Sequence, residues 1–267
     1  MGASDKYSDL PLLKGIDLRN KVAVVTGAGA GIGKATAHIL AQAGCRIVIG
    51  EINAKWADTT TREIEELGGA VIPVVMDVAI RKDAQRLMQT ALKEFGTIDI
   101  LANIAGLYPS ALIHEMEEEE WDRVFDVNVK GVFNCCQAAI PTMMAKRSGK
   151  IINIASVDGM LPGIMPGRSG YGNSHYCSSK GAVITFTKCL AAEMAPYNIN
   201  VNTISPGWVA TEHALSGGRF YEGLKQVPIG RGAQPEEVGQ MVLLLASPAA
   251  DFMVGANLVF SGGCVMD

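Results

Sequence analysis

The most constraining feature of this chain of 267 residues is a regular alternation of short apolar runs with longer amphipathic stretches. The apolar runs are continuous rather than alternating with polar residues, which is typical of strands that are covered on both faces of a parallel sheet. Amphipathic helices between such strands supply the crossovers that parallel pairing needs. The alternation therefore predicts a doubly wound α/β fold, with a mainly parallel sheet of seven strands and helices on both of its faces.

The expected elements are placed by these two patterns. Strands are expected at 22–25, 46–49, 70–75, 98–101, 150–154, 199–204 and 257–260. Helices are expected at 33–43, 54–67, 81–95, 118–146, 175–194 and 235–246. Loops beside the substrate are expected at 159–173 and 212–232. Gly and Pro are frequent throughout the first range and from residue 217 onward in the second. With no repeat or boundary in the pattern, we expect an arm over 1–17 and a single domain over 18–267.

Composition excludes several classes of function. The net charge is −4 and no basic run stands out, which argues against nucleic acid or anionic membranes as partners. No uncharged apolar run reaches the roughly 18 residues of a membrane span, and the N-terminus lacks the features of a signal peptide. The six cysteines show no metal-binding spacing, so we expect no metal and a reduced, cytoplasmic protein. Cys45 and Cys189 are expected to be buried thiols.

A glycine-rich segment, 26–33, follows the first expected strand and opens the first helix. Its spacing is Gly-x-x-x-Gly-x-Gly, carried by Gly27, Gly31 and Gly33. Glycines permit backbone angles and close approaches that a Cβ would block. The helix beyond them offers free N–H groups and a positive dipole end to a pyrophosphate. The strand–turn–helix context therefore predicts a dinucleotide site.

Glu51 ends the second expected strand and indicates which dinucleotide binds. An acidic residue about 20 positions beyond the glycines is placed to accept hydrogen bonds from the adenosine ribose. Its carboxylate would repel the 2′-phosphate of NADP, and the nearest cation in this strand, Arg46, stands at the opposite end. We therefore expect NAD rather than NADP.

Tyr176 and Lys180 stand four positions apart at the start of an expected helix, so both side chains can point to the same place. A nearby ammonium is expected to lower the pKa of the phenol from its reference value of about 10. Such a phenol can transfer protons as a general acid or base. By itself this pair is also compatible with an ordinary solvated contact.

Together these motifs resemble the short-chain dehydrogenase/reductase family, in its single-domain branch, over about residues 18–263. The resemblance rests on motifs in family order: the glycine turn, Asp77, Asn103-Ile104-Ala105-Gly106, Asn128, Ser156, Tyr176-x-x-x-Lys180 and Pro206-Gly207 with Thr211. Ile104 departs from the family's second Asn. The resemblance implies a Rossmann fold that binds NAD through Gly27, Ala30, Gly31, Ile32, Gly33, Glu51, Ile52, Asp77, Val78, Asn103, Ala105, Gly106, Tyr176, Lys180, Pro206, Gly207, Val209 and Thr211.

The resemblance also implies reversible hydride transfer between NAD(H) and a secondary alcohol or ketone. Tyr176 is expected to move the proton, Lys180 to hold the phenolate, and Ser156 to donate a hydrogen bond to the substrate oxygen. Asn128 is expected to position a water that links Lys180 to solvent. Taken singly, Asn128 also suits a backbone kink and Ser156 a loop hydroxyl.

One departure concerns the interval between Ser156 and Tyr176, which is longer than is usual in the family. The surplus, 163–171, is interpreted as an inserted loop beside the substrate. It contains a rival, Tyr171, but the residue four positions further on is His175 rather than Lys. Tyr176 is therefore the expected catalytic tyrosine.

The substrate is expected to be bulky and apolar, such as a hydroxysteroid or an alicyclic or aromatic alcohol, because apolar residues surround the expected site. Besides Ser156 and Tyr176, substrate contacts are expected from Tyr108, Met160 and Trp208. A 3-oxoacyl-type ketoreductase and a sugar or polyol dehydrogenase remain alternatives, and so does a non-enzymatic NAD(H) sensor. The family resemblance implies a homotetramer, with a homodimer as the alternative.

Overall fold

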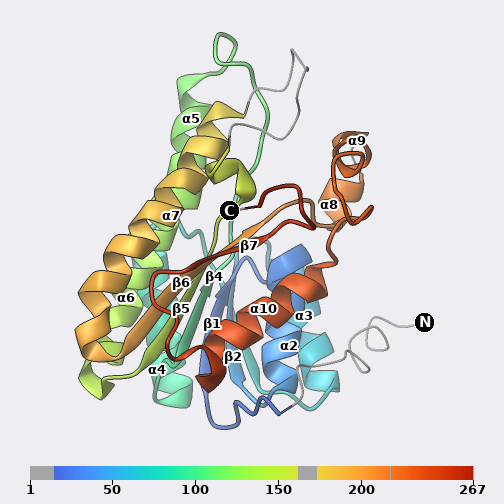
Figure 1. Ribbon diagram of the computed structural model, residues 1–267. Coiled ribbons are helices and arrows are strands. Elements are labelled where there is room, and N and C mark those ends of the chain that lie inside the picture. Colours follow the sequence, from blue (N-terminus) through green and yellow to red (C-terminus); the bar gives the residue numbers. More distant parts are fainter. Residues whose placement is uncertain (1–14, 162–172, 217, 267) are drawn as a thin grey trace.

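A seven-stranded parallel sheet forms the centre of the computed structural model, which describes residues 15–161, 173–216 and 218–266 (Figure 1). The strand order is β3-β2-β1-β4-β5-β6-β7, and all six pairings are parallel. The strands are β1 Val22–Thr26, β2 Arg46–Glu51, β3 Val71–Val75, β4 Ile100–Asn103, β5 Gly149–Ile154, β6 Ile199–Pro206 and β7 Asn257–Phe260. The predicted doubly wound α/β fold is confirmed.

Helices cover both faces of the sheet, as Figure 1 shows. On one face lie α4 Arg81–Phe95, α6 Gly131–Lys146 and α7 Ser174–Met194, and on the other α2 Gly31–Gln42, α3 Ala54–Glu66 and α10 Pro235–Ala246. The side chains of β1 show why. Val22 and Val24 belong to the first core, which lies between the sheet and α4, α6 and α7, whereas Ala23 and Val25 belong to the second core, between the sheet and α2, α3 and α10. Every position of this strand is therefore apolar or buried, which explains its continuous apolar sequence.

The carboxyl ends of the strands meet at one edge of the sheet. Thr26 is in register with Gly50, and Asn103 is in register with Asn153. The chain leaves β1 toward β2 and β3, and then returns to the other side of β1 as β4. Ligands of open α/β sheets bind at this kind of reversal, outside the carboxyl ends.

The helix predicted over 118–146 is interrupted. It consists of α5 Glu118–Phe125, a π-helical turn η1 Asp126–Lys130, and α6. A π-turn adds one residue to a helix and shifts the helical phase only once within this long stretch, and the sequence pattern did not reveal that single shift.

The segment predicted as a loop over 212–232 contains two short helices, α8 Glu212–Leu215 and α9 Gly218–Leu224. Gly223 of α9 serves close packing, because a Cβ on it would lie 2.1 Å from the Trp208 ring. Most of the other predicted loop, 162–172, lies outside the described residues, and so does Tyr171.

Two further expectations can be compared with the structure. Cys45 is buried as predicted, but Cys189 is exposed, because it stands one position away from the buried Leu190 on α7 and faces outward. None of the helices within the described ranges combines the length and apolar character needed to cross a bilayer.

Candidate active site

The glycine-rich turn between β1 and α2 leaves no room for side chains. A Cβ on Gly27, whose φ is +66°, would lie 2.8 Å from the Cα of Ala105. A Cβ on Gly33 would lie 2.0 Å from the carbonyl oxygen of Gly27, and one on Gly31 would lie 3.0 Å from Cγ2 of Thr211. The turn is therefore closed on itself and held against two other loops at the carboxyl edge.

The start of α2 has no side-chain cap. Its N-cap residue, Ala30, makes no side-chain hydrogen bond, and its first turn holds no acidic residue. In contrast, Asn53 caps α3 by accepting hydrogen bonds from the N–H groups of Lys55 and Trp56. The first N–H groups of α2, at Ile32 and its neighbours, are thus left for an anion, and the turn fits the pyrophosphate of a dinucleotide.

The buried carboxylate of Glu51 lies directly against the glycine turn. Its Oε2 accepts a hydrogen bond from the N–H of Gly29 at 2.9 Å, and its Oε1 accepts one from the N–H of Asn53 at 3.0 Å. A Cβ on Gly29 would lie 2.8 Å from the carboxylate carbon. Gly29 therefore makes room for Glu51, a role that the spacing of the other glycines did not reveal.

Asp77 and Val78 follow β3. One carboxylate oxygen of Asp77 accepts a hydrogen bond from the N–H of Ala79 at 2.9 Å, and the other pairs with Arg123 of α5 at 3.0 Å. Val78 is buried, whereas Ile52 is exposed. The cofactor contact predicted for Asp77 would therefore share its carboxylate with Arg123.

Thr26 joins the glycine turn to the loop after β4. Its hydroxyl accepts hydrogen bonds from the N–H groups of Ile104 at 3.0 Å and Ala105 at 3.3 Å. Thr26 opens the glycine-rich segment, and no role of its own was predicted for it. A polar residue at the end of a buried strand is the sequence feature that could have indicated this role.

The Asn103 side chain points into the sheet rather than toward the ligand edge. Its Nδ2 donates to Oδ1 of Asn153 at 2.8 Å, and the amide of Asn153 donates to the hydroxyl of Thr187 on α7 at 2.9 Å. These bonds direct the Asn103 amide away from the predicted cofactor site. Gly106 lies further along, where a Cβ would be 3.4 Å from Nζ of Lys180.

The segment after β6 forms the opposite side of the site. Gly207 follows Pro206 and approaches Ser261 so closely that a Cβ would lie 3.1 Å from the Cα of Ser261. Val209 forms an isolated parallel bridge, and Thr211 caps α8 with its hydroxyl. The segment thus faces the glycine turn.

Ser156, Tyr176 and Lys180 come together at the end of β5 and the start of α7. The hydroxyl of Ser156 hydrogen bonds with the phenol of Tyr176 and also accepts the N–H of Asp158 at 3.1 Å. Nζ of Lys180 donates to the carbonyl oxygen of Ile154 at 2.9 Å and lies 5.8 Å from the centroid of the Tyr176 ring. The three predicted side chains therefore form one cluster.

A glycine contact fixes this cluster. A Cβ on Gly159 would lie 2.6 Å from the N atom of Gly181 and from the carbonyl carbon of Lys180. The short 3-10 turn Val157–Gly159 after Ser156 therefore rests directly on the backbone of α7.

Burial opposes the ionisation of both Tyr176 and Lys180. It raises the pKa of Tyr176 above its usual value of 10, and the hydrogen bond from Ser156 acts in the opposite direction without overcoming it. Burial lowers the pKa of Lys180 from 10.5 to about 8. The expectation that Lys180 lowers the pKa of Tyr176 is wrong for the chain by itself, because burial raises that pKa and the Lys180 ammonium donates to the carbonyl oxygen of Ile154.

Asn128 lies in the π-turn and is fully buried. Its Oδ1 accepts the N–H of Leu107 at 2.8 Å, and its Nδ2 donates to the carbonyl oxygen of Leu107 at 2.9 Å and to the hydroxyl of Ser179 at 3.0 Å. The side chain thus links the loop after β4 to α7.

Aromatic residues lie beside Tyr176. The ring of Tyr108 is 6.3 Å from the ring of Tyr176 and 5.1 Å from the ring of His213, edge to face in both cases. The Tyr108 hydroxyl also hydrogen bonds with Thr211. Tyr108 therefore connects the catalytic cluster with the segment after β6.

Two other expected substrate contacts have partners within the protein. The Met160 sulfur accepts a hydrogen bond from Nδ2 of Asn257 at 3.3 Å, and Met160 packs against the first core. Trp208 packs edge to face on the buried ring of Phe220, with centroids 6.2 Å apart. Because Met160 and Trp208 have these partners within the protein, Tyr108 is a better candidate than either of them for contact with the substrate.

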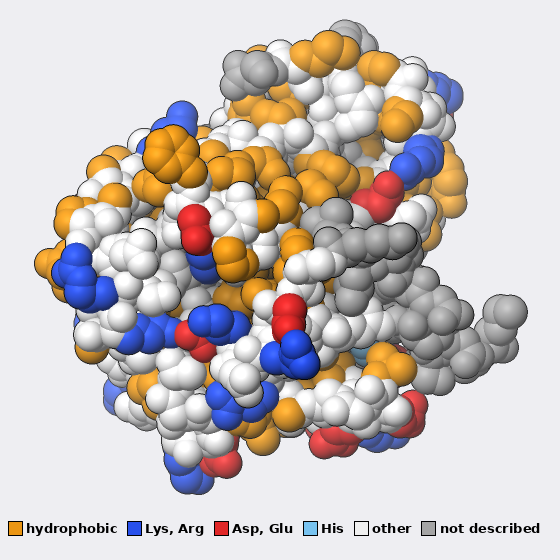
Figure 2. Space-filling model, turned by 60° about the horizontal axis from the view of Figure 1, so that its bottom comes forward, with side chains coloured by type: hydrophobic (Ala, Val, Ile, Leu, Met, Phe, Trp, Pro, Cys, Tyr) orange, Lys and Arg blue, Asp and Glu red, His pale blue; other side chains and the backbone are white. Residues whose placement is uncertain are grey.

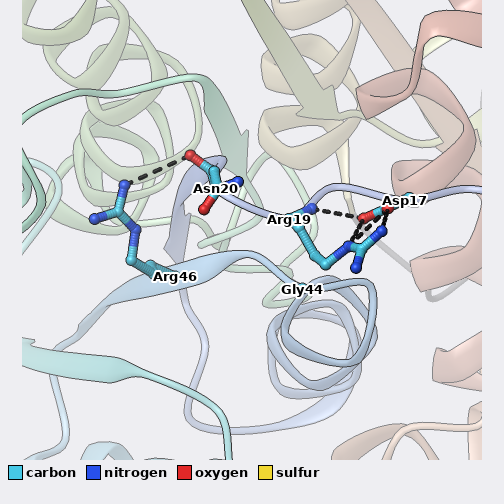
Figure 3. A pocket seen from close by; sticks show the side chains of 5 residues that line it. All are labelled: Asp17, Arg19, Asn20, Gly44 and Arg46. Atoms are coloured by element: carbon cyan, nitrogen blue, oxygen red, sulfur yellow. Dashed lines mark hydrogen bonds and ion pairs between the residues drawn. The ribbon is translucent and has the colours of Figure 1, made fainter.

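A hollow of about 470 Å³, whose lining residues are drawn in Figure 3, lies near the starts of β1 and β2, at the opposite end of the strands from Ser156 and Tyr176. It is lined by Asp17, Arg19, Asn20, Gly44 and Arg46. Arg19 pairs with Asp17 at 2.5 Å, and the guanidinium group of Arg46 lies 5.2 Å from the ring centroid of Phe95. Since both guanidinium groups have partners, we assign no ligand to this hollow.

Charged side chains also pair locally elsewhere. Figure 2 shows basic and acidic side chains next to one another when the bottom of Figure 1 is turned forward. Lys150, for example, pairs with Asp251 at 2.5 Å. Over the described ranges, no group of three or more His, Cys, Asp or Glu side chains is arranged to hold a metal ion.

Comparisons with known proteins agree with this geometry. The family model for short chain dehydrogenases matches residues 21–218. The 3-oxoacyl-[acyl-carrier-protein] reductase FabG of Thermotoga maritima is 38% identical over 251 residues, which cover 93% of this chain and 99% of that protein. A 3-oxoacyl-[acyl-carrier-protein] reductase of Synechocystis is 39% identical over 252 residues, covering 93% and 98%.

A solved structure resembles this chain over most of its length. The crystal structure of a short-chain type dehydrogenase/reductase from Mycobacterium marinum superposes with a TM-score of 0.88 at 35% identity, covering 94% of this chain and 98% of that one. The fold, the matched family model and the relatives together identify an oxidoreductase that uses a nicotinamide cofactor. This chain belongs to the short-chain dehydrogenase/reductase family.

Proposed function

We propose that this protein catalyses the reversible reduction of a 3-oxoacyl-type ketone to a secondary alcohol, with NAD(H) as its cofactor. The observation that carries the proposal is the hydrogen-bonded pair of Ser156 and Tyr176, with Lys180 one helical turn further along α7. The substrate class is supported by the relatives, which are named as 3-oxoacyl-[acyl-carrier-protein] reductases.

Tyr176 is the proton donor in this proposal. Because its pKa is raised, the phenol stays protonated near neutral pH, which suits donation to a ketone oxygen. Ser156 donates a second hydrogen bond to the same oxygen, on which negative charge develops during reduction. When bound, the nicotinamide supplies the hydride. In the reverse direction, Tyr176 must accept the proton of the alcohol.

We propose that Lys180 returns a proton to Tyr176 after Tyr176 has protonated the ketone oxygen. With a pKa lowered to about 8, its ammonium group is a better proton donor than an ordinary lysine. The side chain of Asn128 is occupied by Leu107 and Ser179. We therefore propose that the backbone of the π-turn, rather than the Asn128 amide, binds the water that links Lys180 to solvent.

Glu51 is proposed to select NAD(H). Its two hydrogen bonds to backbone N–H groups hold the carboxylate rigidly beside the glycine turn, where a 2′-phosphate would meet a negative charge. The test compares kcat/KM for NADH and NADPH in the wild type, Glu51→Ala and Glu51→Gln. Glu51→Gln is the matched control, because it removes the charge and keeps an acceptor of similar shape.

We expect the wild type to prefer NADH and both variants to use NADPH better than the wild type does. If the wild type uses NADPH as well as NADH, Glu51 does not determine the choice of cofactor. If only Glu51→Ala gains activity with NADPH, shape rather than charge excludes the phosphate.

The substrate is tested with a panel followed by nicotinamide absorbance at 340 nm. It contains a short 3-oxoacyl thioester, a ketosteroid, a cyclic ketone and, in the oxidation direction, a polyol. We expect the thioester to give the highest kcat/KM, and Tyr176→Phe to abolish its turnover. Tyr171→Phe, outside the described residues, is the control and should retain activity.

One observation lowers support for the bulky apolar substrate. Trp208, which was expected to contact an apolar substrate, packs on the ring of Phe220 and against Gly223 of α9. A ketosteroid that outperformed the thioester would restore that hypothesis. Tight nucleotide binding with no turnover of any compound would instead favour an NAD(H) sensor.

A further inference from the structure

The residue that precedes Tyr176 makes a buried polar contact for which the reaction has no direct use. His175 is fully buried in the first turn of α7, and its Nε2 lies 3.0 Å from Oε1 of Glu120 in α5. Figure 1 shows α5 near the start of α7, in agreement with their packing. A buried imidazole is costly unless its N–H groups are bonded, so this contact is a specific feature of the site.

Glu120 differs from its acidic neighbours. Glu117, Glu118 and Glu119 are exposed, whereas Glu120 is partly buried and turns toward His175. Because a carboxylate only accepts hydrogen bonds, the shared proton belongs to Nε2 of His175. Among the described residues, Nδ1 of the same ring has no hydrogen-bond partner. Glu120 is therefore the polar group that orients this ring.

The N-terminus of α7 has no side-chain cap of its own. Its N-cap residue, Asn173, makes no side-chain hydrogen bond to the helix. One turn further along, Ser179 accepts from the Asn128 amide at 3.0 Å and donates to the carbonyl oxygen of Tyr176 at 2.7 Å. Tyr176 thus lies between two links to the α5–η1 segment, one through His175 and one through Ser179.

We propose that His175 and Glu120 form a positioning pair, which fixes the first turn of α7 so that the Tyr176 phenol meets Ser156 and the substrate oxygen. The inference rests on the proposed function, in which Tyr176 transfers the proton. Neither His175 nor Glu120 touches the reacting atoms. Loss of the link frees the end of the helix that carries Tyr176 and leaves Lys180 held by Ile154.

The test measures kcat, KM and the nucleotide dissociation constant for Glu120→Ala, Glu120→Gln and Glu119→Ala. A displacement of about 1 Å can slow an enzyme by roughly 10²-fold. We therefore expect Glu120→Ala to lower kcat by about tenfold to a hundredfold, with little change in nucleotide affinity. Glu120→Gln keeps an oxygen acceptor for Nε2 and should restore kcat, and Glu119→Ala should behave like the wild type.

A second measurement separates this inference from the proposed function. Crystal structures of the wild type and Glu120→Ala should differ in the distance between the Tyr176 and Ser156 hydroxyls, whether or not a substrate is known. An inactive wild type would overturn the proposed function and leave this comparison valid. The positioning role is refuted if Glu120→Ala keeps the wild-type kcat, if Glu120→Gln fails to rescue it, or if the hydroxyl distance is unchanged.

Discussion

Replacement of Lys180 by methionine should change how the stability of the protein depends on pH. Burial lowers the pKa of this lysine from 10.5 to about 8, so the folded chain loses the proton at a lower pH than the unfolded chain. Between these two values the unfolded state binds more protons, and the free energy of unfolding must rise with pH. Methionine has a similar length and no titrating group, so the variant lacks this contribution.

The magnitude follows from the two pKa values. Each pH unit between them corresponds to about 1.4 kcal/mol, so the full window contributes roughly 3 kcal/mol. The contribution is absent below about pH 8, where both states hold the proton, and is complete near pH 10.5. The buried thiols of Cys45 and Cys135, whose pKa values burial raises to about 12, lower stability above pH 9. They do so equally in both proteins and cancel in the difference.

The assay is urea unfolding of the wild type and Lys180→Met from pH 7 to pH 10, at one protein concentration and without nucleotide. The free energy of unfolding of the wild type should rise relative to that of the variant as the pH rises, and most of this rise should occur above pH 8. Parallel stability curves across this range would refute the assignment of Lys180 as a desolvated lysine, and with it the proposed return of its proton to Tyr176.

Three further changes test other parts of the site. Ser156→Ala should lower kcat roughly 10²–10³-fold with unchanged nucleotide affinity, as expected for loss of a donor to a developing oxyanion, and an unchanged kcat would contradict this role. Gly33→Ala places a Cβ 2.0 Å from a carbonyl oxygen of the same turn and should abolish nucleotide binding in calorimetry, whereas Gly218→Ala, with open space around its Cβ, should bind normally. Thr187→Val leaves the buried amide of Asn153 without its acceptor and should lower the free energy of unfolding by about 1–3 kcal/mol in urea, and equal midpoints would show that the amide finds another partner.

Much of the fold could be predicted because each strand is buried on both faces. The apolar run at 257–260 and the periodic stretches at 81–95 and 235–246 match β7, α4 and α10 in their bounds. The helix α9 was missed because its glycines were taken as signs of a loop. Gly223 of α9 instead allows close contact with the Trp208 ring, and Gly232, beyond the helix, allows close contact with Phe220. A packing role of this kind depends on the partner rather than on the local sequence.

The candidate site divides in the same way. Glu51, Ser156 and Tyr176 could be placed because they follow strands or begin a helix, and parallel strands bring such positions to one edge. The pKa of Tyr176 could not be predicted, because it depends on how deeply neighbouring segments bury the ring. The contact between Glu120 and His175 was equally hidden, since it joins residues 55 positions apart.

The π-turn at Asp126–Lys130 has a consequence for how this chain can change in length. Each residue of a helix turns the chain by about 100°, so removing one residue from the turn would rotate everything after it by that angle. Asn128 would then lose its phase with Cys135, Ala139 and Met143, which pack in the core on α6. After a one-residue deletion here, Asn128 could keep its hydrogen bonds to Leu107 and Ser179 only if the apolar side chains of α6 turned away from the core. The π-turn therefore sets the rotation between α5 and α6, so that Asn128 keeps its hydrogen bonds to Leu107 and Ser179 while the apolar side chains of α6 face the core.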